Sequence, residues 1–111
     1  MTDFTVAIPT YNGAERLPLV IEKLSSQINI EELSWEVIVI DNNSKDNTKT
    51  IVVEYQKKWS QQITLRYFFE EQQGAGFARK KVVQVANSPL IGFLDDDNIP
   101  AQNWVAAAYE F

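Results

Sequence analysis

The stretch WEVIVI, residues 35–40, is nearly continuous in apolar character. An apolar run of this length favours a strand, and a strand without polar alternation is expected to be buried on both faces. Strands buried on both faces are typical of parallel sheets, in which helices cover each side. The polar run DNNS, residues 41–44, ends this stretch. The pattern therefore predicts an inner strand of a parallel α/β sheet.

Three more apolar runs predict strands around this one. Phe4–Ile8 stops at Pro9, Ile63–Phe68 alternates in the manner of an edge strand, and Leu90–Leu94 is expected to be a buried strand. Each predicted strand is followed by an amphipathic segment. Four strand–helix units in a row predict a parallel sheet with helices on both faces, and ligands in such folds bind outside the carboxyl ends of the strands.

The helices are predicted from apolar residues that recur three and four positions apart. They are expected to begin near Glu15, near Asp46 or Asn47, after the loop Gln72–Gly76 and near Pro100, and the third is expected to end before Pro89. Their predicted apolar faces are Leu17, Val20, Ile21 and Leu24; Ile51, Val52, Tyr55 and Trp59; Ala78, Val82, Val85 and Ala86; and Trp104, Ala108 and Phe111. The tryptophans, Trp35 included, are interpreted as core residues.

The composition limits the chemistry. The chain has 111 residues, neither cysteine nor histidine, and a formal net charge of −5. Without thiolates or imidazoles a metal would have oxygen ligands, which favours Mg²⁺, Mn²⁺ or Ca²⁺. The negative charge argues against a nucleic-acid partner. The sequence starts without a basic region followed by a long apolar run, so a cytoplasmic domain is expected.

The acidic triplet Asp95-Asp96-Asp97 directly follows the fourth predicted strand. Three adjacent carboxylates repel one another, and a bound cation would relieve that repulsion. A solvated acidic turn is the alternative interpretation. The triplet, Asp41–Ser44 and Pro9–Asn12 all lie where a predicted strand ends. In a parallel sheet these three polar clusters would meet at one edge, which favours a binding site.

Four motifs, in this order, resemble family 2 glycosyltransferases of the GT-A fold: VAIPTYN (6–12), VIDNNS (39–44), GFAR (76–79) and FLDDDN (93–98). Each motif alone is weak, whereas the four together are specific and extend through essentially the whole chain. The chain departs from the family's frequent asparagines around the glycine loop, where it has Gln72 or Gln73, and Lys80. The resemblance implies a Rossmann-like parallel sheet with strand order 3-2-1-4, the N-terminal portion of the GT-A fold.

The resemblance also implies an activity. It implies a metal-dependent, inverting transfer of a sugar from a nucleotide-diphosphate sugar, with a UDP-sugar as donor, to a hydroxyl of a glycan or lipid-linked acceptor. The cofactor would be Mn²⁺ or Mg²⁺, with Asp97 as direct ligand. Asp95 and Asp96 would hold ribose hydroxyls or water in the outer sphere of the cation. A divalent cation would stabilise the charge on the leaving diphosphate as a Lewis acid.

The other motifs would bind the nucleotide. By resemblance, Asp41 would accept the imide N–H of uracil, Tyr11 would lie against the base, and Pro9 and Thr10 would shape the pocket. Asn12 and Asn43, in the same two motifs, are included as nucleotide-sugar-binding candidates. Arg79 is expected in the first turn of the third helix, where it would face an anion. The alternatives are a turn or helix cap for Asp41 and a strand-ending turn for Pro9–Asn12.

Two other functions fit parts of the pattern. An aspartyl-phosphate phosphatase or a receiver domain also places carboxylates at strand ends around Mg²⁺, although its nucleophilic Asp normally follows an early strand. A non-catalytic module could use the carboxylates for a structural ion. These would be distinguished by acyl-phosphate labelling of an Asp, and by metal binding that is indifferent to UDP.

Residues 1–111 are expected to be one nucleotide-sugar-binding domain and the N-terminal part of a longer glycosyltransferase. No residue here matches the family's catalytic base, and the fourth predicted strand has no strand after it. The open sheet edge makes self-association an expectation. The full-length protein is expected in the cytoplasm, at the inner face of a membrane.

Overall fold

The computed structural model describes residues 2–59 and 63–110, in which strands and helices alternate along the chain. The strands are β1 (Phe4–Thr10), β2 (Trp35–Asp41), β3 (Thr64–Phe69) and β4 (Ile91–Phe93). The helices are α1 (Leu17–Ser25), α2 (Thr48–Lys58), α3 (Ala75–Val85) and α4 (Trp104–Glu110). The predicted succession of strand–helix units is therefore confirmed.

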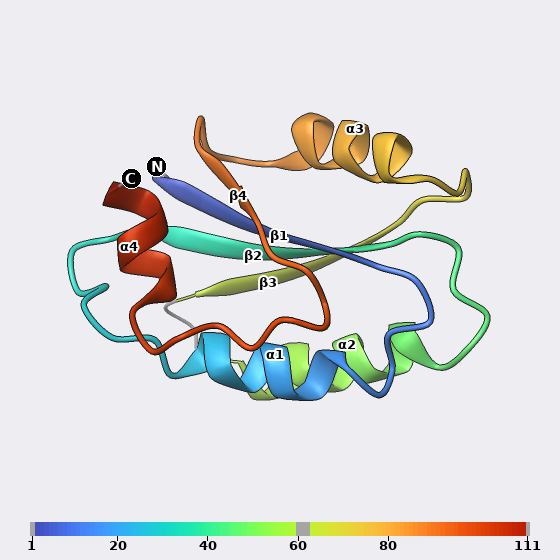
Figure 1. Ribbon diagram of the computed structural model, residues 1–111, viewed down its shortest axis with the longest axis horizontal. Helices are drawn as coiled ribbons and strands as arrows, with labels where there is room; N and C mark the ends of the chain where they lie inside the picture. The colour runs from blue at the N-terminus through green and yellow to red at the C-terminus, as the bar shows by residue number, and fades with distance from the viewer. Residues whose placement is uncertain (1, 60–62, 111) are drawn as a thin grey trace.

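The four strands form one parallel sheet in the order β3-β2-β1-β4 (Figure 1). The predicted order 3-2-1-4 is confirmed. β1 and β2 pair along their whole length, from Phe4 opposite Trp35 to Thr10 opposite Asp41. This register brings the loops after β1 and β2 to the same edge of the sheet.

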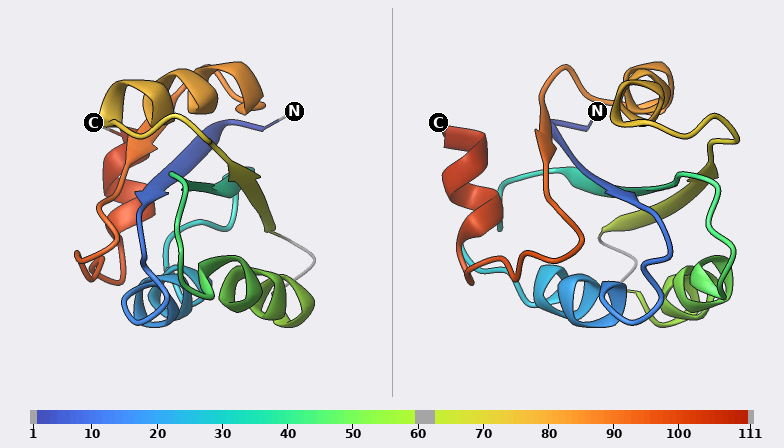
Figure 2. Two further views of the ribbon diagram at one scale, coloured as in Figure 1. Left: turned by 90° about the vertical axis from the view of Figure 1, so that its right-hand side faces the viewer. Right: turned by 45° about the vertical axis from the view of Figure 1, so that its right-hand side comes forward.

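Helices cover both faces of the sheet, as Figures 1 and 2 show: α1 and α2 on one face and α3 on the other. Alternate side chains of a strand point to opposite faces, so β2 contributes to two separate cores. Every residue of β2 is buried, as its apolar sequence predicted. The larger core, under α1 and α2, includes Val6, Ile8, Leu17, Val20, Ile21, Leu24, Val37, Val39 and Val52. The smaller core, under α3, consists of Ala7, Ile38, Ile40, Ala78 and Val82.

The tryptophans that were predicted to be core residues differ in burial. Trp35 is buried, whereas Trp59 and Trp104 are half-buried and pack against the larger core. Phe111, predicted on the face of the last helix, lies outside the described residues. Within the described ranges, no helix combines the length and the apolar character needed to span a bilayer.

The end of β1 differs from the prediction, because the strand continues through Pro9 to Thr10. Proline lacks the N–H that a central strand needs, and it is tolerated where no neighbouring strand requires that donor. The Thr10 carbonyl accepts the N–H of Asn42 on the β2 side, so Pro9 faces the β4 side. The β4 side of β1 makes its last hydrogen bond at Ala7, to the N–H of Leu94. Pro9 therefore costs the sheet no hydrogen bond.

The prediction of a buried fourth strand was wrong. β4 has three residues and lies at the edge of the sheet, where 44% of Phe93 and 48% of Leu90 are exposed. An edge strand has a neighbour on one side only, so its apolar sequence did not ensure burial. The last helix also begins later than predicted, at Trp104, which leaves Pro100 in the preceding loop.

The third helix begins earlier than predicted. Gly74, with a φ of 135°, is its N-cap, and Ala75 is its first residue. Such a φ favours glycine because side chains clash there, which explains why the helix starts directly after this residue. Arg79 is consequently the fifth residue of α3 rather than a first-turn residue, and the prediction for its position was wrong.

Candidate functional site

A cleft of about 330 Å³ lies at the carboxyl edge of the sheet, where the loops after β1, β2 and β4 meet the start of α3. It contains four of the predicted site residues, together with four that were not predicted. The lining residues are Pro9, Thr10, Tyr11, Arg16, Asn42, Ala75, Ala78 and Asp96. Segments far apart in the sequence thus build one concave site, at the place where parallel α/β sheets bind ligands.

Asp96 is fixed at the floor of this site by two residues from β1 and the loop after it. The Thr10 hydroxyl donates to Asp96 Oδ2 at 2.6 Å. Arg16 donates from Nε to Oδ1 at 3.1 Å and from its terminal nitrogen to Oδ2 at 3.0 Å, so the ion pair is bidentate. Arg16 also donates to the Tyr11 carbonyl at 2.9 Å. The pKa of Arg16 is raised, chiefly because the Asp96 carboxylate accepts its hydrogen bonds, so the guanidinium stays charged.

The two neighbours of Asp96 have a different environment. Asp95 and Asp97 are exposed, and among the described residues no side chain donates a hydrogen bond to either carboxylate. Within residues 2–59 and 63–110, no three carboxylates converge into a group that could bind a metal by themselves. The triplet therefore consists of one fixed carboxylate between two that face solvent.

Asp41 is buried at the end of β2, with an exposed fraction of 2%. Its Oδ1 accepts the backbone N–H of Ser44 at 2.8 Å, and its Oδ2 accepts the Tyr67 hydroxyl at 2.5 Å. The turn role considered from the sequence is thus present. Burial, followed by the hydrogen bond to Asp41, raises the pKa of Tyr67 and keeps its hydroxyl protonated.

Side-chain hydrogen bonds hold the loops of this edge together. The Ser44 hydroxyl accepts the N–H of Asn12 at 2.7 Å, and Asn12 Oδ1 accepts the N–H of Lys45 at 2.7 Å. Asn42 donates to the Gln72 carbonyl at 2.8 Å and accepts the N–H of Gly74 at 2.9 Å. Asn12 therefore connects the loops after β1 and β2, and Asn42 connects the loop after β2 to the start of α3.

The lining of the cleft lacks six of the predicted residues: Asn12, Asp41, Asp95 and Asp97, whose contacts are described above, and also Asn43 and Arg79. Asn43 has a φ of 67° and accepts a hydrogen bond from Lys45 Nζ at 3.3 Å. Arg79 is exposed on α3, with its guanidinium carbon 6.0 Å from the centre of the Phe93 ring. Cation–π contact of this kind places Arg79 over the end of β4, next to the acidic loop.

Three polar residues that line the cleft or contact a predicted site residue were not predicted from the sequence: Arg16, Asn42 and Tyr67. Arg16 carried a signal, because a cation in the loop after the first strand is a natural partner for an acidic loop at the same edge. Asn42 was passed over in favour of Asn43, its neighbour in the same motif. Tyr67 carried no local signal, because its contact with Asp41 depends on the register of β3 against β2.

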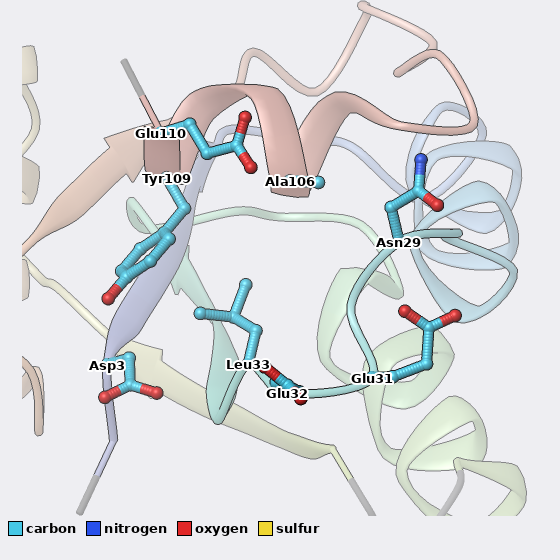
Figure 3. A pocket seen from close by; sticks show the side chains of 8 residues that line it. All are labelled: Asp3, Asn29, Glu31, Glu32, Leu33, Ala106, Tyr109 and Glu110. Atoms are coloured by element: carbon cyan, nitrogen blue, oxygen red, sulfur yellow. The ribbon is translucent and has the colours of Figure 1, made fainter.

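A second hollow, of about 490 Å³, lies at the opposite edge, beside the first residues of β1 and β2 (Figure 3). Its lining includes the carboxylates of Asp3, Glu31, Glu32 and Glu110, and among the residues that the structure describes no basic side chain contributes to it. A negative lining repels an anionic ligand. The chemistry of this hollow therefore does not suit a nucleotide, whereas the cleft at the carboxyl edge contains the guanidinium of Arg16.

Curated proteins similar to this chain are glycosyltransferases. The chain is 33% identical over 101 residues to "Glycosyltransferase AglE" of Haloferax volcanii, covering 91% of this chain and 32% of AglE. It is 32% identical over 112 residues to WfgD of Escherichia coli, a "UDP-Glc:alpha-D-GlcNAc-diphosphoundecaprenol beta-1,3-glucosyltransferase", covering 99% of this chain and 40% of WfgD. The chain therefore spans between a third and two fifths of these relatives' length.

Solved structures share the fold. The structure of S. aureus TarS 1–349 in complex with UDP matches with a TM-score of 0.82 and 25% sequence identity, over 98% of this chain and 31% of that one. The parallel sheet with strand order 3-2-1-4 and flanking helices is that of the GT-A fold. The family model for "Glycosyl transferase family 2" matches residues 5–111. With this match, the site and the strand order, the chain belongs to glycosyl transferase family 2.

Proposed function

We propose that this chain binds the nucleotide-diphosphate sugar of an inverting glycosyltransferase, with a UDP-sugar as the donor. The observation that carries the proposal is the cleft at the carboxyl edge, which is lined by Tyr11, Arg16 and Asp96, with Asp95 and Asp97 on either side of Asp96 in the chain. Family membership supports it, as does the UDP in the TarS structure.

A divalent cation, Mn²⁺ or Mg²⁺, completes the proposed site. Asp97 would be its direct ligand, with Asp95 as second ligand or as partner of the ribose hydroxyls. Their carboxylates suit these cations, because Mg²⁺ is usually bound through one or two carboxylates together with substrate phosphates. The cation would supply Lewis-acid stabilisation of the leaving diphosphate. The diphosphate of the nucleotide would supply the ligands that these two carboxylates do not.

The nucleoside would lie against the loops after β1 and β2. Tyr11, which is 47% exposed, offers its ring to the base, while Pro9 and Thr10 form the wall of the cleft. Asp41 would accept the imide N–H of uracil. Each carboxylate oxygen has two lone pairs, so the hydrogen bonds from Ser44 and Tyr67 leave acceptor capacity for the base.

Asn12 would support this nucleoside pocket through its contacts with the loop after β2. Asn43 and Arg79 would bind the donor from beside the cleft, the guanidinium of Arg79 serving the phosphates. The acceptor of the whole protein would be a glycan or a lipid-linked sugar at the inner face of the membrane. The name of WfgD, which includes a diphosphoundecaprenol, supports a lipid-linked acceptor.

Calorimetric titration of UDP into the intact protein, with and without Mn²⁺, tests the proposal. The diphosphate and the carboxylates share the cation, so Mn²⁺ should tighten UDP binding by about fivefold or more. Asp97→Ala should abolish most of this enhancement and leave the metal-free affinity for UDP nearly unchanged.

The matched control is Glu54→Ala, which removes an exposed carboxylate from α2, far from the acidic loop in the chain. It should retain the full enhancement by Mn²⁺. Equal UDP affinity for wild type and Asp97→Ala, with and without the metal, would refute the assignment of Asp97. A protein that binds Mn²⁺ but no UDP would instead be a module for a structural ion.

A further inference from the structure

We propose that Arg16 is a positioning residue that keeps the Asp96 carboxylate away from the divalent cation, so that the cation binds tightly only together with the nucleotide. This inference rests on the proposed function, because it concerns the same metal and the same nucleotide. It assigns different roles to the three adjacent aspartates and adds a residue that neither the sequence motifs nor the family match singles out.

The ion pair between Arg16 and Asp96 determines which carboxylates of the triplet are available to a cation. The fork of Arg16 contacts both oxygens of Asp96, and the Thr10 hydroxyl contacts Oδ2 from the other side. Bidentate ion pairs between a guanidinium and a carboxylate are directional as well as strong. The Asp96 side chain is only 14% exposed, whereas Asp95 and Asp97 face solvent. A cation reaching this loop therefore meets two available carboxylates.

The surroundings leave Asp96 little freedom to turn toward solvent. Gly13 lies so close that a Cβ built there would be 3.0 Å from Asp96 Oδ2 and 1.9 Å from the Thr10 hydroxyl. Arg16 is itself anchored, since it also donates to the Tyr11 carbonyl. Through its contacts with Asp96 and Tyr11, Arg16 thus joins the acidic loop to the loop after β1, which is the proposed wall of the nucleoside pocket.

The charge of Arg16 also determines how strongly the acidic loop attracts a cation. Three free carboxylates would attract a divalent cation strongly even without a substrate, and Arg16 neutralises one of them. The remaining two provide too few ligands for a closed shell, and the diphosphate of the nucleotide supplies the rest. Because linkage is reciprocal, a cation that binds weakly alone and tightly with UDP also tightens the binding of UDP.

The test is a double-mutant cycle with Mn²⁺ and UDP as probes. Titration calorimetry would measure Mn²⁺ binding, alone and with saturating UDP, for wild type, Arg16→Gln, Asp96→Asn and the double variant. Arg16→Gln should tighten the binding of Mn²⁺ alone by about fivefold or more, and should reduce the enhancement by UDP. In the Asp96→Asn background, the same change should have a much smaller effect on Mn²⁺ binding.

Two further variants control for charge and folding. Arg16→Lys retains the charge but loses the fork, so it should still tighten the binding of Mn²⁺ alone. Lys23→Gln removes an exposed cation from α1, the helix that begins directly after Arg16, and should leave all the affinities unchanged. Thermal unfolding would confirm that each variant is folded, and Arg16, whose side chain is 43% exposed, should be replaceable without loss of the fold.

The outcomes separate this inference from the proposed function. If Arg16→Gln tightened the binding of Mn²⁺ alone by the same factor in the wild-type and Asp96→Asn proteins, Arg16 would act only through its charge. That result would overturn this inference but not the proposed function. A loss of UDP affinity on Arg16→Gln without metal, in both backgrounds, would make Arg16 a direct nucleotide ligand and would also overturn it. Absence of UDP binding by the wild-type protein would overturn both.

Discussion

The buried contact between Asp41 and Tyr67 is the clearest example of a single residue whose chemistry is set by its partner. The Tyr67 hydroxyl donates to a carboxylate that is almost completely withdrawn from water. Ionisation of Tyr67 would place two negative charges side by side, so its pKa is raised, with burial as the largest cause. The end of β2 is thus held by an acid–phenol pair whose hydroxyl stays protonated at neutral pH.

This pair leads to a prediction about alkaline pH. Unfolded tyrosines ionise near pH 10, whereas folded Tyr67 retains its proton to higher pH, and Tyr55 has a pKa of about 12, raised mainly by its hydrogen bond to Glu22. Below pH 10 both states are protonated, and the stabilisation is fully present. Above pH 10 the unfolded state loses protons first, so the free energy of unfolding should fall, approaching about 1.4 kcal/mol per pH unit for Tyr67 and less for Tyr55, whose hydrogen bond is screened by solvent.

Urea unfolding from about pH 9 to about pH 11.5, a range that spans the ordinary tyrosine pKa of about 10, would measure this slope. Tyr67→Phe should make the slope shallower, and should reduce stability at neutral pH by about 1.5–3 kcal/mol because Asp41 loses a buried donor. Tyr55→Phe, whose hydrogen bond is exposed, should also flatten the slope but cost less at neutral pH. An unchanged slope in Tyr67→Phe would contradict the prediction.

For single residues, the sequence predicted at which edge of the sheet the polar side chains lie, but not their hydrogen-bonding partners. The apolar run 35–40 and the polar ends of the strands placed Thr10, Asp41 and Asp96 at one edge, and the structure brings them there. Their partners Arg16 and Tyr67 depend on loop geometry and strand register. Neither is determined by local sequence, because hydrogen bonds between distant segments form only once the sheet has assembled.

The start of α3 shows how one glycine sets the position of an element. Gly74 combines a φ of 135° with a ψ of 143°, a region of backbone conformation that is essentially restricted to glycine. It also donates its N–H to Asn42 Oδ1, which ties the helix start to the loop after β2. The beginning of α3, and with it the Ala75 wall of the cleft, therefore depends on this residue.

Two alanine substitutions in this segment should have opposite effects. Gly74→Ala should destabilise the protein by about 1–3 kcal/mol, because a side chain is strained at this φ. Gly76→Ala should stabilise it by about 0.4–1 kcal/mol, because Gly76 is helical and a Cβ there meets no atom within 4 Å. Urea denaturation would measure both, and a neutral or stabilising Gly74→Ala would contradict this account of the helix start.

The sequence located the elements but not all their limits. Pro9 predicted the end of β1, yet the strand continues, because β4 is too short to need a donor from Pro9. Leu90–Leu94 predicted a buried strand from composition alone, whereas exposure depends on the edge position of β4. In both cases, the deciding factor was the neighbouring strand, which the local sequence does not contain.

For the molecule as a whole, the two faces of the sheet are stabilised in different ways. The face under α1 and α2 has a large apolar core, whereas the face under α3 has a small one with a buried carboxylate beside it. That carboxylate, Glu36 of β2, is 2% exposed. It accepts hydrogen bonds from Thr5 of β1 at 2.7 Å, from Arg66 of β3 at 3.0 Å and from the N–H of Asn87 after α3 at 2.7 Å. One side chain thus connects three strands and the segment that leads into β4.

Loss of this carboxylate should therefore weaken the whole assembly. Glu36→Ala would leave the Arg66 guanidinium without its buried partner, and we expect a loss of about 3–5 kcal/mol in the free energy of unfolding. Glu36→Gln retains the shape and one acceptor oxygen, so its cost should be smaller, and Glu54→Ala, at an exposed position of α2, should be nearly neutral. Urea denaturation would give all three values. A loss below about 1 kcal/mol for Glu36→Ala would mean that apolar packing alone holds α3 and β4 in place.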